Sequence, residues 1–272
     1  MRSADPGSTT GGPPPARLDL IAARHEMVDT QLAARGIRDP VVLDAMRTVP
    51  REAFLPDTLA EYAYDDGPLP IGEGQTISQP YVVAFMTEAV SPRPDDRALE
   101  IGTGSGYSAA VLASVVAEVY TVERISTLAE ASARRLTDLG YRNVHVRCGD
   151  GSLGWPEHAP YDVIIVTAGG PRIPSALLEQ LAAGGRLVMP VGGDPCFQWL
   201  VRVRRQADST VLEERLEPVA FVPLVGAQGW PEPGTGGTPA PAEAPHDLRS
   251  SNQETRIGTP ARTASDTEQR HG

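Results

Sequence analysis

The chain has 272 residues, 40% of them hydrophobic and 22% charged, so it can build a sizeable core. Its formal net charge of -11 argues against nucleic-acid binding, because phosphate backbones attract clustered basic residues. The sequence contains no lysine, which excludes Schiff-base chemistry and lysine-dependent phosphate loops.

The two cysteines, Cys148 and Cys196, lie far apart and form no metal-binding spacing. We therefore expect no metal site and predict buried thiols in a reducing compartment. The longest apolar stretch, 109–117, is too short to span a bilayer, and residues 1–16 lack the apolar core of a secretory signal. The sequence predicts a cytoplasmic protein without a membrane partner.

Both ends of the chain are poor in large apolar residues. We expect residues 1–17 and 231–272 to be disordered, because neither segment can bury enough surface to offset its ordering entropy. The remaining residues, 18–230, form one predicted domain. Its N-terminal part, 18–96, is expected to be helical and to bind substrate, and its second part, 97–230, to form a cofactor-binding sheet.

Two helices are predicted near the start of this domain. One helical stripe carries Leu18, Ile21, His25, Val28 and Leu32, and Gly36 ends it. Asp39 and Pro40 then form an N-cap and a first-turn proline, which predicts a second helix up to residue 46.

From residue 97 onward, strands alternate with helices. Strands are predicted over 98–101, 119–122, 144–148, 162–167 and 186–190, with helices over 107–116, 125–139 and 174–182 between them. Two further, antiparallel strands are predicted over 197–203 and 211–224. This alternation is typical of a doubly wound, mostly parallel α/β sheet.

A glycine-rich turn joins the first of these strands to its helix. Residues 99–106 read Leu-Glu-Ile-Gly-Thr-Gly-Ser-Gly, and glycines there let the backbone approach a ligand closely. The spacing differs from the dinucleotide fingerprint, which disfavours a nicotinamide dehydrogenase. The acid Glu100 favours a ligand with a cationic amino-acid end, although a tight turn without ligand explains the glycines equally well.

Acids also end the next two strands. Glu123 is placed to accept both hydroxyls of a ribose, or alternatively to stabilise the start of the following helix. Asp150 lies between two glycines after the third strand, where a simple turn is the alternative. Together with the glycine-rich turn, these acids predict a pocket for an adenosine that carries a cationic amino acid, as in S-adenosylmethionine.

The stretch 74–86, Gly-Gln-Thr-Ile-Ser-Gln-Pro-Tyr followed by Val-Val-Ala-Phe-Met, resembles the signature of protein-L-isoaspartate (D-aspartate) O-methyltransferases. The segments 99–107, 122–125, 149–155, 161–168, 184–192 and 221–224 follow in the same order, so the resemblance covers about 25–230. Departures are small: Ser108 and Ala109 stand where many relatives carry Gln-Thr, and the segment after Trp230 has no counterpart.

The resemblance implies a seven-stranded S-adenosylmethionine-dependent methyltransferase sheet with extra N-terminal helices and rearranged last strands. It implies methyl transfer to the free α-carboxylate of L-isoaspartyl residues in damaged proteins, with no metal and, we expect, a monomeric enzyme. Ser78 would be the catalytic residue, and Thr76 and Ile77 would bind substrate with it. The cofactor would be bound by Glu100, Gly102, Thr103, Gly104, Ser105, Gly106, Glu123, Arg124, Asp150 and Gly151.

The residues fit this chemistry independently. A carboxylate is already ionised at neutral pH, so its methylation needs no general base, and hydroxyl donors such as Thr76 and Ser78 suffice to hold it. Ser78 could instead cap a helix that begins at Pro80. Two other functions stay open: a dedicated carboxyl methyltransferase of a biosynthetic peptide, and a non-catalytic adaptor that recognises isoaspartate.

Overall fold

The computed structural model describes residues 19–194, 197–208 and 210–232. The predicted disordered head, Leu18, Cys196 and the predicted disordered tail beyond residue 232 therefore lie outside the described residues. A seven-stranded sheet has the strand order β5-β4-β3-β6-β7-β8-β9. Its strands are β3 (Arg97–Ile101), β4 (Glu118–Glu123), β5 (Val144–Cys148), β6 (Tyr161–Val166), β7 (Leu181–Asp194), β8 (Phe197–Arg205) and β9 (Val211–Val219).

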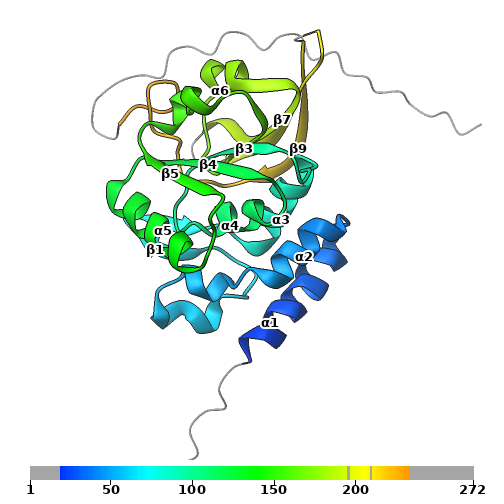
Figure 1. The fold of residues 1–272 in the computed structure, drawn as a ribbon, viewed down its shortest axis with the longest axis vertical. Coiled ribbons are helices and arrows are strands. Elements are labelled where there is room, and N and C mark those ends of the chain that lie inside the picture. The colour runs from blue at the N-terminus through cyan, green and yellow to red at the C-terminus, as the bar shows by residue number, and fades with distance from the viewer. Residues whose placement is uncertain (1–18, 195–196, 209, 233–272) are drawn as a thin grey trace, which may run out of the picture. The chain divides into compact units, whose positions relative to one another are not determined.

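The sheet is parallel from β5 to β7, and β8 and β9 join it in antiparallel pairing. Helices α3 (Pro80–Ala89), α4 (Tyr107–Ala113) and α5 (Ser126–Asp138) lie on one face, and α6 (Ser175–Gln180) lies on the other (Figure 1). This confirms the predicted doubly wound architecture. Because β4 and β6 flank β3 on opposite sides, the chain reverses its direction of winding there, where such folds bind ligands.

The core has two layers, one on each side of the sheet. Along β3, Ala98 packs with the α3 and α4 side and Leu99 with the α6 side, and both are fully buried. Burial on both faces explains why the central strands are rich in apolar residues and could be predicted from the sequence.

The N-terminal helices carry the predicted start and stop signals. Helix α1 (Leu20–Met27) continues as a π-helical turn (Val28–Leu32) and a 3-10 turn (Ala33–Arg35), and Gly36 ends it with a φ of 105°. In α2 (Pro40–Thr48), the Asp39 carboxylate accepts a hydrogen bond from the amide of Val41, as predicted. Short 3-10 helices cover Arg51–Phe54, Asp57–Tyr62, Gly151–Leu153 and Pro156–His158.

Several boundary predictions were wrong. The strand predicted over 186–190 is longer, Leu181–Asp194, and the helix predicted over 107–116 ends at Ala113. Residues 181–182, predicted to end a helix, already belong to β7, because Leu181 pairs with Tyr161 of β6 and this pairing overrides local helix propensity. The predicted last strand, 211–224, ends at Val219; residues beyond it leave the sheet, and Pro223 forms an isolated bridge with Gly169.

Cys148 is a free, exposed thiol at the end of β5, so the prediction of buried thiols was wrong for this residue. It lies at the end of an edge strand, which leaves its side chain uncovered.

Among the described residues, no helix combines the length and apolar character needed to cross a bilayer.

Candidate active site

A cavity of about 550 Å³, including its open mouth, lies at the C-terminal ends of β3 and β4. Three parts of the chain line it: the glycine-rich turn with the ends of neighbouring strands, strand β2 (Gln75–Ile77), and a C-terminal segment. Of the predicted cofactor residues, it is lined by Gly102, Gly104, Glu123, Arg124 and Gly151.

The glycine-rich turn has a backbone that other residues rarely adopt. Gly102, Gly104 and Gly106 have φ angles of 95°, 53° and 92°. A Cβ atom on Gly102 would lie 2.4 Å from the Thr167 hydroxyl, so glycine is also required by space. The turn therefore presents bare backbone to the cavity.

Glu100 lies behind this turn rather than in the lining of the cavity. It is fully buried, and one carboxylate oxygen accepts a hydrogen bond from the Thr121 hydroxyl at 2.7 Å. The Thr103 hydroxyl lies 2.6 Å from that of Thr121, so the three side chains form a chain beneath the turn. Among the described residues, the other oxygen of Glu100, Oε1, has no hydrogen-bond partner. Thr103, Ser105 and Gly106 likewise support the turn from outside the lining.

Burial raises the pKa of Glu100 to about 7, against the lowering effect of the Thr121 hydrogen bond. The folded chain thus holds this proton more tightly than the unfolded chain, whose value is 4.5. The protonated carboxyl group contributes its full stability below the pKa of the unfolded chain, and this stability is lost as the pH rises through the pKa of the folded chain. Glu100→Gln should remove this pH-dependent loss of stability.

We therefore expect Glu100→Gln to gain about 2 kcal/mol of unfolding free energy over the parent chain between pH 5 and pH 8. Glutamine keeps an acceptor for Thr121 and cannot ionise. Urea unfolding of both proteins at the two pH values measures the difference. A difference that does not change with pH would contradict a carboxyl group that ionises across this range.

Glu123 stabilises the start of α5, which is one of the two roles that the sequence left open. It is 5% exposed, and its two carboxylate oxygens accept hydrogen bonds from the amides of Gly104 and Ile125, each at 2.9 Å. The carboxylate thus orders both the glycine-rich turn and the start of α5. An ionised carboxylate has about four acceptor positions, so two remain for the hydroxyls of a ribose in the cavity.

Asp150 lies beside the cavity, outside its lining. One oxygen, Oδ1, accepts from the amide and the hydroxyl of Ser152, and Oδ2 accepts from the amide of Ala227 at 2.8 Å. The structure thus ties this predicted ligand to the C-terminal segment. Its neighbour in the prediction, Gly151, lines the cavity, where a Cβ atom would lie 2.4 Å from the Ile101 side chain.

The second wall comes from a β-hairpin that the sequence analysis missed. Strand β1 (Leu69–Gly72) pairs with β2 (Gln75–Ile77), and the turn between them has positive φ at both Glu73 and Gly74. Glu73 at the tip accepts a hydrogen bond from the Thr127 hydroxyl at 3.0 Å. This contact fixes the hairpin against the start of α5, next to the cavity.

The three residues predicted to bind substrate follow one another at the end of this hairpin. Thr76 is exposed and lines the cavity, Ile77 is 4% exposed in the core, and Ser78 is half-buried outside the lining. The N-cap of α3 is Gln79, so the alternative that Ser78 caps this helix was wrong. Within the described part of the chain, the hydroxyls of Thr76 and Ser78 have no hydrogen-bond partner, which leaves them available to a substrate.

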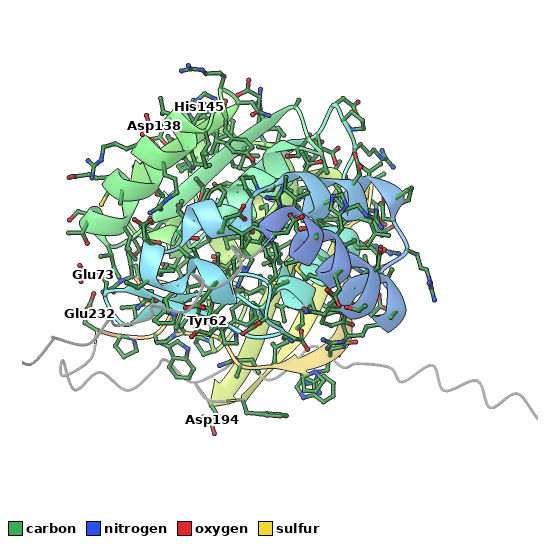
Figure 2. All side chains as sticks on the ribbon, turned by 90° about the horizontal axis from the view of Figure 1, so that it is seen from below. Tyr62, Glu73, Asp138, His145, Asp194 and Glu232 are labelled. Atoms are coloured by element: carbon green, nitrogen blue, oxygen red, sulfur yellow. The ribbon has the colours of Figure 1, made fainter. Side chains whose placement is uncertain are left out.

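The third wall is the C-terminal segment 222–225, which the sequence analysis assigned to a strand. Its backbone pairs with Gly169 in the loop after β6: Gly169 donates to Val222, and Leu224 donates to Gly169, each at 2.8 Å. Farther on, Arg124 forms a 2.7 Å ion pair with Glu232. Glu232 and Glu73 lie on the same side of the molecule (Figure 2). The hairpin contacts Thr127 through Glu73, and the C-terminal segment contacts Arg124 through Glu232, so both reach the junction of β4 and α5.

These residues fit an adenosine-type cofactor with an amino-acid end. The glycine-rich turn contributes Gly102 and Gly104 to the lining of the cavity, and Glu123 offers two open acceptor positions beside them. In the described ranges, no group of three or more acidic, histidine or cysteine side chains could hold a metal ion.

Comparison with known proteins identifies the family. The family model for protein-L-isoaspartate(D-aspartate) O-methyltransferase matches residues 22–229. Protein-L-isoaspartate O-methyltransferase 2 of Pelobacter propionicus is 60% identical over 207 residues, which are 76% of this chain and 92% of the relative. Protein-L-isoaspartate O-methyltransferase 1 of Geotalea uraniireducens is 58% identical over 212 residues, or 78% and 97% of the two chains.

Solved structures agree with the sequence comparisons. A protein-L-isoaspartate O-methyltransferase superposes with a TM-score of 0.68 at 32% identity, covering 75% of this chain and 67% of that one. A Plasmodium falciparum protein described with the same activity, in complex with S-adenosyl-L-homocysteine, superposes with a TM-score of 0.62 at 25% identity, covering 73% and 96%. The chain therefore belongs to the protein-L-isoaspartate(D-aspartate) O-methyltransferase family.

Proposed function

We propose that the chain transfers a methyl group from S-adenosyl-L-methionine to the free α-carboxylate of L-isoaspartyl residues, initiating repair of damaged proteins and peptides. One observation carries this proposal: the glycine-rich turn, Glu123 and Thr76 border the same cavity.

On the donor side, the sulfonium of S-adenosyl-L-methionine supplies an activated methyl group. The backbone of Gly102 and Gly104 would approach the amino-acid end of the donor, and Glu123 would accept the ribose hydroxyls. Glu100, Thr103 and Ser105 would hold the turn from behind, and Gly106 would let it pack on α5. Arg124 and Gly151 would lie around the adenine end of the donor, and Asp150 would act from outside the lining by holding the C-terminal segment.

On the substrate side, the hydroxyls of Thr76 and Ser78 would donate hydrogen bonds to the α-carboxylate and direct one oxygen toward the methyl group. Ser78 is the proposed catalytic residue, and the buried Ile77 would hold the segment in place. Because the nucleophile is already an anion, the protein needs only to align it and exclude water. Alignment of this kind can contribute roughly 7–11 kcal/mol.

This mechanism predicts how the rate depends on pH. With a saturating donor, methyl transfer should be nearly constant from pH 6 to pH 8, because a carboxylate with a pKa of about 4 stays ionised there. With an amine nucleophile, the rate would instead rise about tenfold for each unit of pH increase, up to the pKa of the amine. Initial rates of labelled methyl transfer measure this dependence. A steeply rising rate with a product that survives mild base would contradict carboxyl methylation.

The proposal includes a division of the domain and a cellular setting. Residues 18–96 would bind substrate and 97–230 the cofactor, because the hairpin and the glycine-rich turn lie on either side of residue 97. We propose a cytoplasmic monomer without nucleic-acid or membrane partners. The net charge of -11 argues against a nucleic-acid partner, and the free thiol of Cys148 supports a reducing compartment. Sedimentation velocity measures the oligomeric state.

A further inference from the structure

A turn of the C-terminal segment, residues 226–228, is bound at a small polar cluster beside the cavity. The Asp150 carboxylate accepts from the amide of Ala227 at 2.8 Å, and the Ser152 hydroxyl accepts from the amide of Gln228 at 3.0 Å. The same hydroxyl donates to Asp150 at 2.7 Å, so the carboxylate and the hydroxyl form one unit. We call Asp150, Ser152 and the turn 226–228 the clasp.

The clasp is closely packed as well as hydrogen-bonded. Ser152 is fully buried. A Cβ atom on Gly226 would lie 2.1 Å from Asp150 Oδ1 and 2.7 Å from the Ser152 hydroxyl oxygen, so only glycine lets the turn approach this far. No side chain of the clasp lines the cavity itself.

The clasp holds the far end of the wall that closes the cavity. Residues 222–225 line the cavity, and the clasp begins at the next residue. The near end is held separately, because the amide of Phe221 donates to Gln198 at 2.8 Å and the amide of Leu224 donates to Gly169. The wall is thus held at both ends, and Trp230 adds further contacts: its amide donates to Leu224 and its indole donates to Gly169.

We propose that Ser152 is a positioning residue of the methyl-donor site: through the clasp, its hydroxyl holds the wall 222–225 against the bound donor. The inference rests on the proposed function for the identity of the donor. Without the hydroxyl, the amide of Gln228 loses its acceptor, and the bond from Ala227 to Asp150 is the one that remains within the clasp. Outside the clasp, the turn keeps the bond from the Gly226 amide to Trp230 and the bonds that the Gln228 side chain accepts from Ser175 and Ala176. The wall then opens more often and the donor dissociates faster, whereas the aligned methyl group and carboxylate are unchanged once the donor is bound.

The test compares Ser152→Ala with the full chain, using S-adenosyl-L-homocysteine as the probe. We expect the dissociation constant to rise about tenfold by calorimetry, mainly through faster release in stopped-flow displacement. The KM for the methyl donor should rise to the same extent, and kcat with isoaspartyl peptide at saturating donor should stay within about twofold. Binding is measured well below the unfolding temperature, so lower stability alone leaves the dissociation constant unchanged.

Ser175→Ala is the matched control. The Ser175 hydroxyl also contacts Gln228, but through its side-chain oxygen and at an exposed position, so donor binding should not change. Gly226→Ala is an independent second variant, because its methyl group displaces the turn and leaves Ser152 in place. It should weaken probe binding at least as much as Ser152→Ala does. If Ser152→Ala does not fold, Gly226→Ala alone shows whether the clasp supports donor binding.

An unchanged dissociation constant in both Ser152→Ala and Gly226→Ala would overturn the proposal, and so would an equal loss in Ser175→Ala. A fall in kcat at saturating donor without a change in probe binding would also overturn it. Failure of the proposed function is distinguishable, because it shows as absent methylation by the parent chain, whereas probe binding still reports on the clasp.

Discussion

Glu123→Ala is expected to weaken the binding of S-adenosyl-L-homocysteine about 100-fold. Two hydrogen bonds from ribose hydroxyls to a carboxylate are worth roughly 3 kcal/mol or more together, and 1.4 kcal/mol corresponds to a factor of ten. The variant also frees the amides of Gly104 and Ile125, which now bind the carboxylate, so the cradle for the donor loses its order. Calorimetric titration measures the dissociation constant directly.

Glu118→Ala is the control for this measurement. Glu118 lies on the same strand, but it is partly exposed and contacts His145 at the other end of β4, far along the strand from the cavity. Its removal should leave probe binding unchanged. If Glu123→Ala also binds the probe as tightly as the parent chain, the carboxylate serves only to stabilise the start of α5, and its role in donor binding is wrong.

Ser78→Ala should lower kcat roughly 10- to 100-fold and leave probe binding nearly unchanged. A hydrogen bond to a charged group contributes about 1.5–3 kcal/mol, and Ser78 has no other partner in the described residues. Because Gln79 is the N-cap of α3, the loss cannot come from an uncapped helix. Steady-state kinetics with an isoaspartyl peptide, at saturating donor, measure the effect.

Ser78→Thr is the informative companion, because it keeps the hydroxyl and adds only a methyl group. It should retain more activity than Ser78→Ala. Parent-level kcat in Ser78→Ala would remove this residue from the catalytic group and leave the substrate contact to Thr76. A similar loss of donor binding and of kcat would instead indicate that Ser78 supports the fold of the hairpin.

The sheet was predictable because its signals are local and strong. Strand β5 (Val144–Cys148) was predicted with its bounds intact, and the apolar strands β3, β4 and β6 were found within one or two residues. The hairpin was missed because Pro70, Gly72 and Gly74 interrupt the alternation expected of strands. Its register depends on the turn at Glu73 and on the contact with Thr127, which is distant in sequence.

The site was predictable only where one motif supplies the contact. Gly102, Gly104 and Glu123 follow from a strand, a turn and the next strand, and they line the cavity as predicted. The wall 222–225 carries an apolar pattern that favours a strand, and only its pairing with Gly169 shows that it leaves the sheet. The sequence likewise placed Asp150 at the right edge, but its contact with Ala227 depends on the folded C-terminal segment.

The most direct test of the proposed function is labelled methyl transfer to a peptide that contains one L-isoaspartyl residue, beside the same peptide with a normal aspartyl residue. We expect the isoaspartyl peptide to be labelled, its aspartyl isomer to stay unlabelled, and the label to be released in mild base. Equal labelling of both peptides would contradict recognition of the isoaspartyl α-carboxylate. Labelling of neither, by a protein that binds S-adenosyl-L-homocysteine, would contradict the repair activity and favour a dedicated peptide methyltransferase or a non-catalytic adaptor.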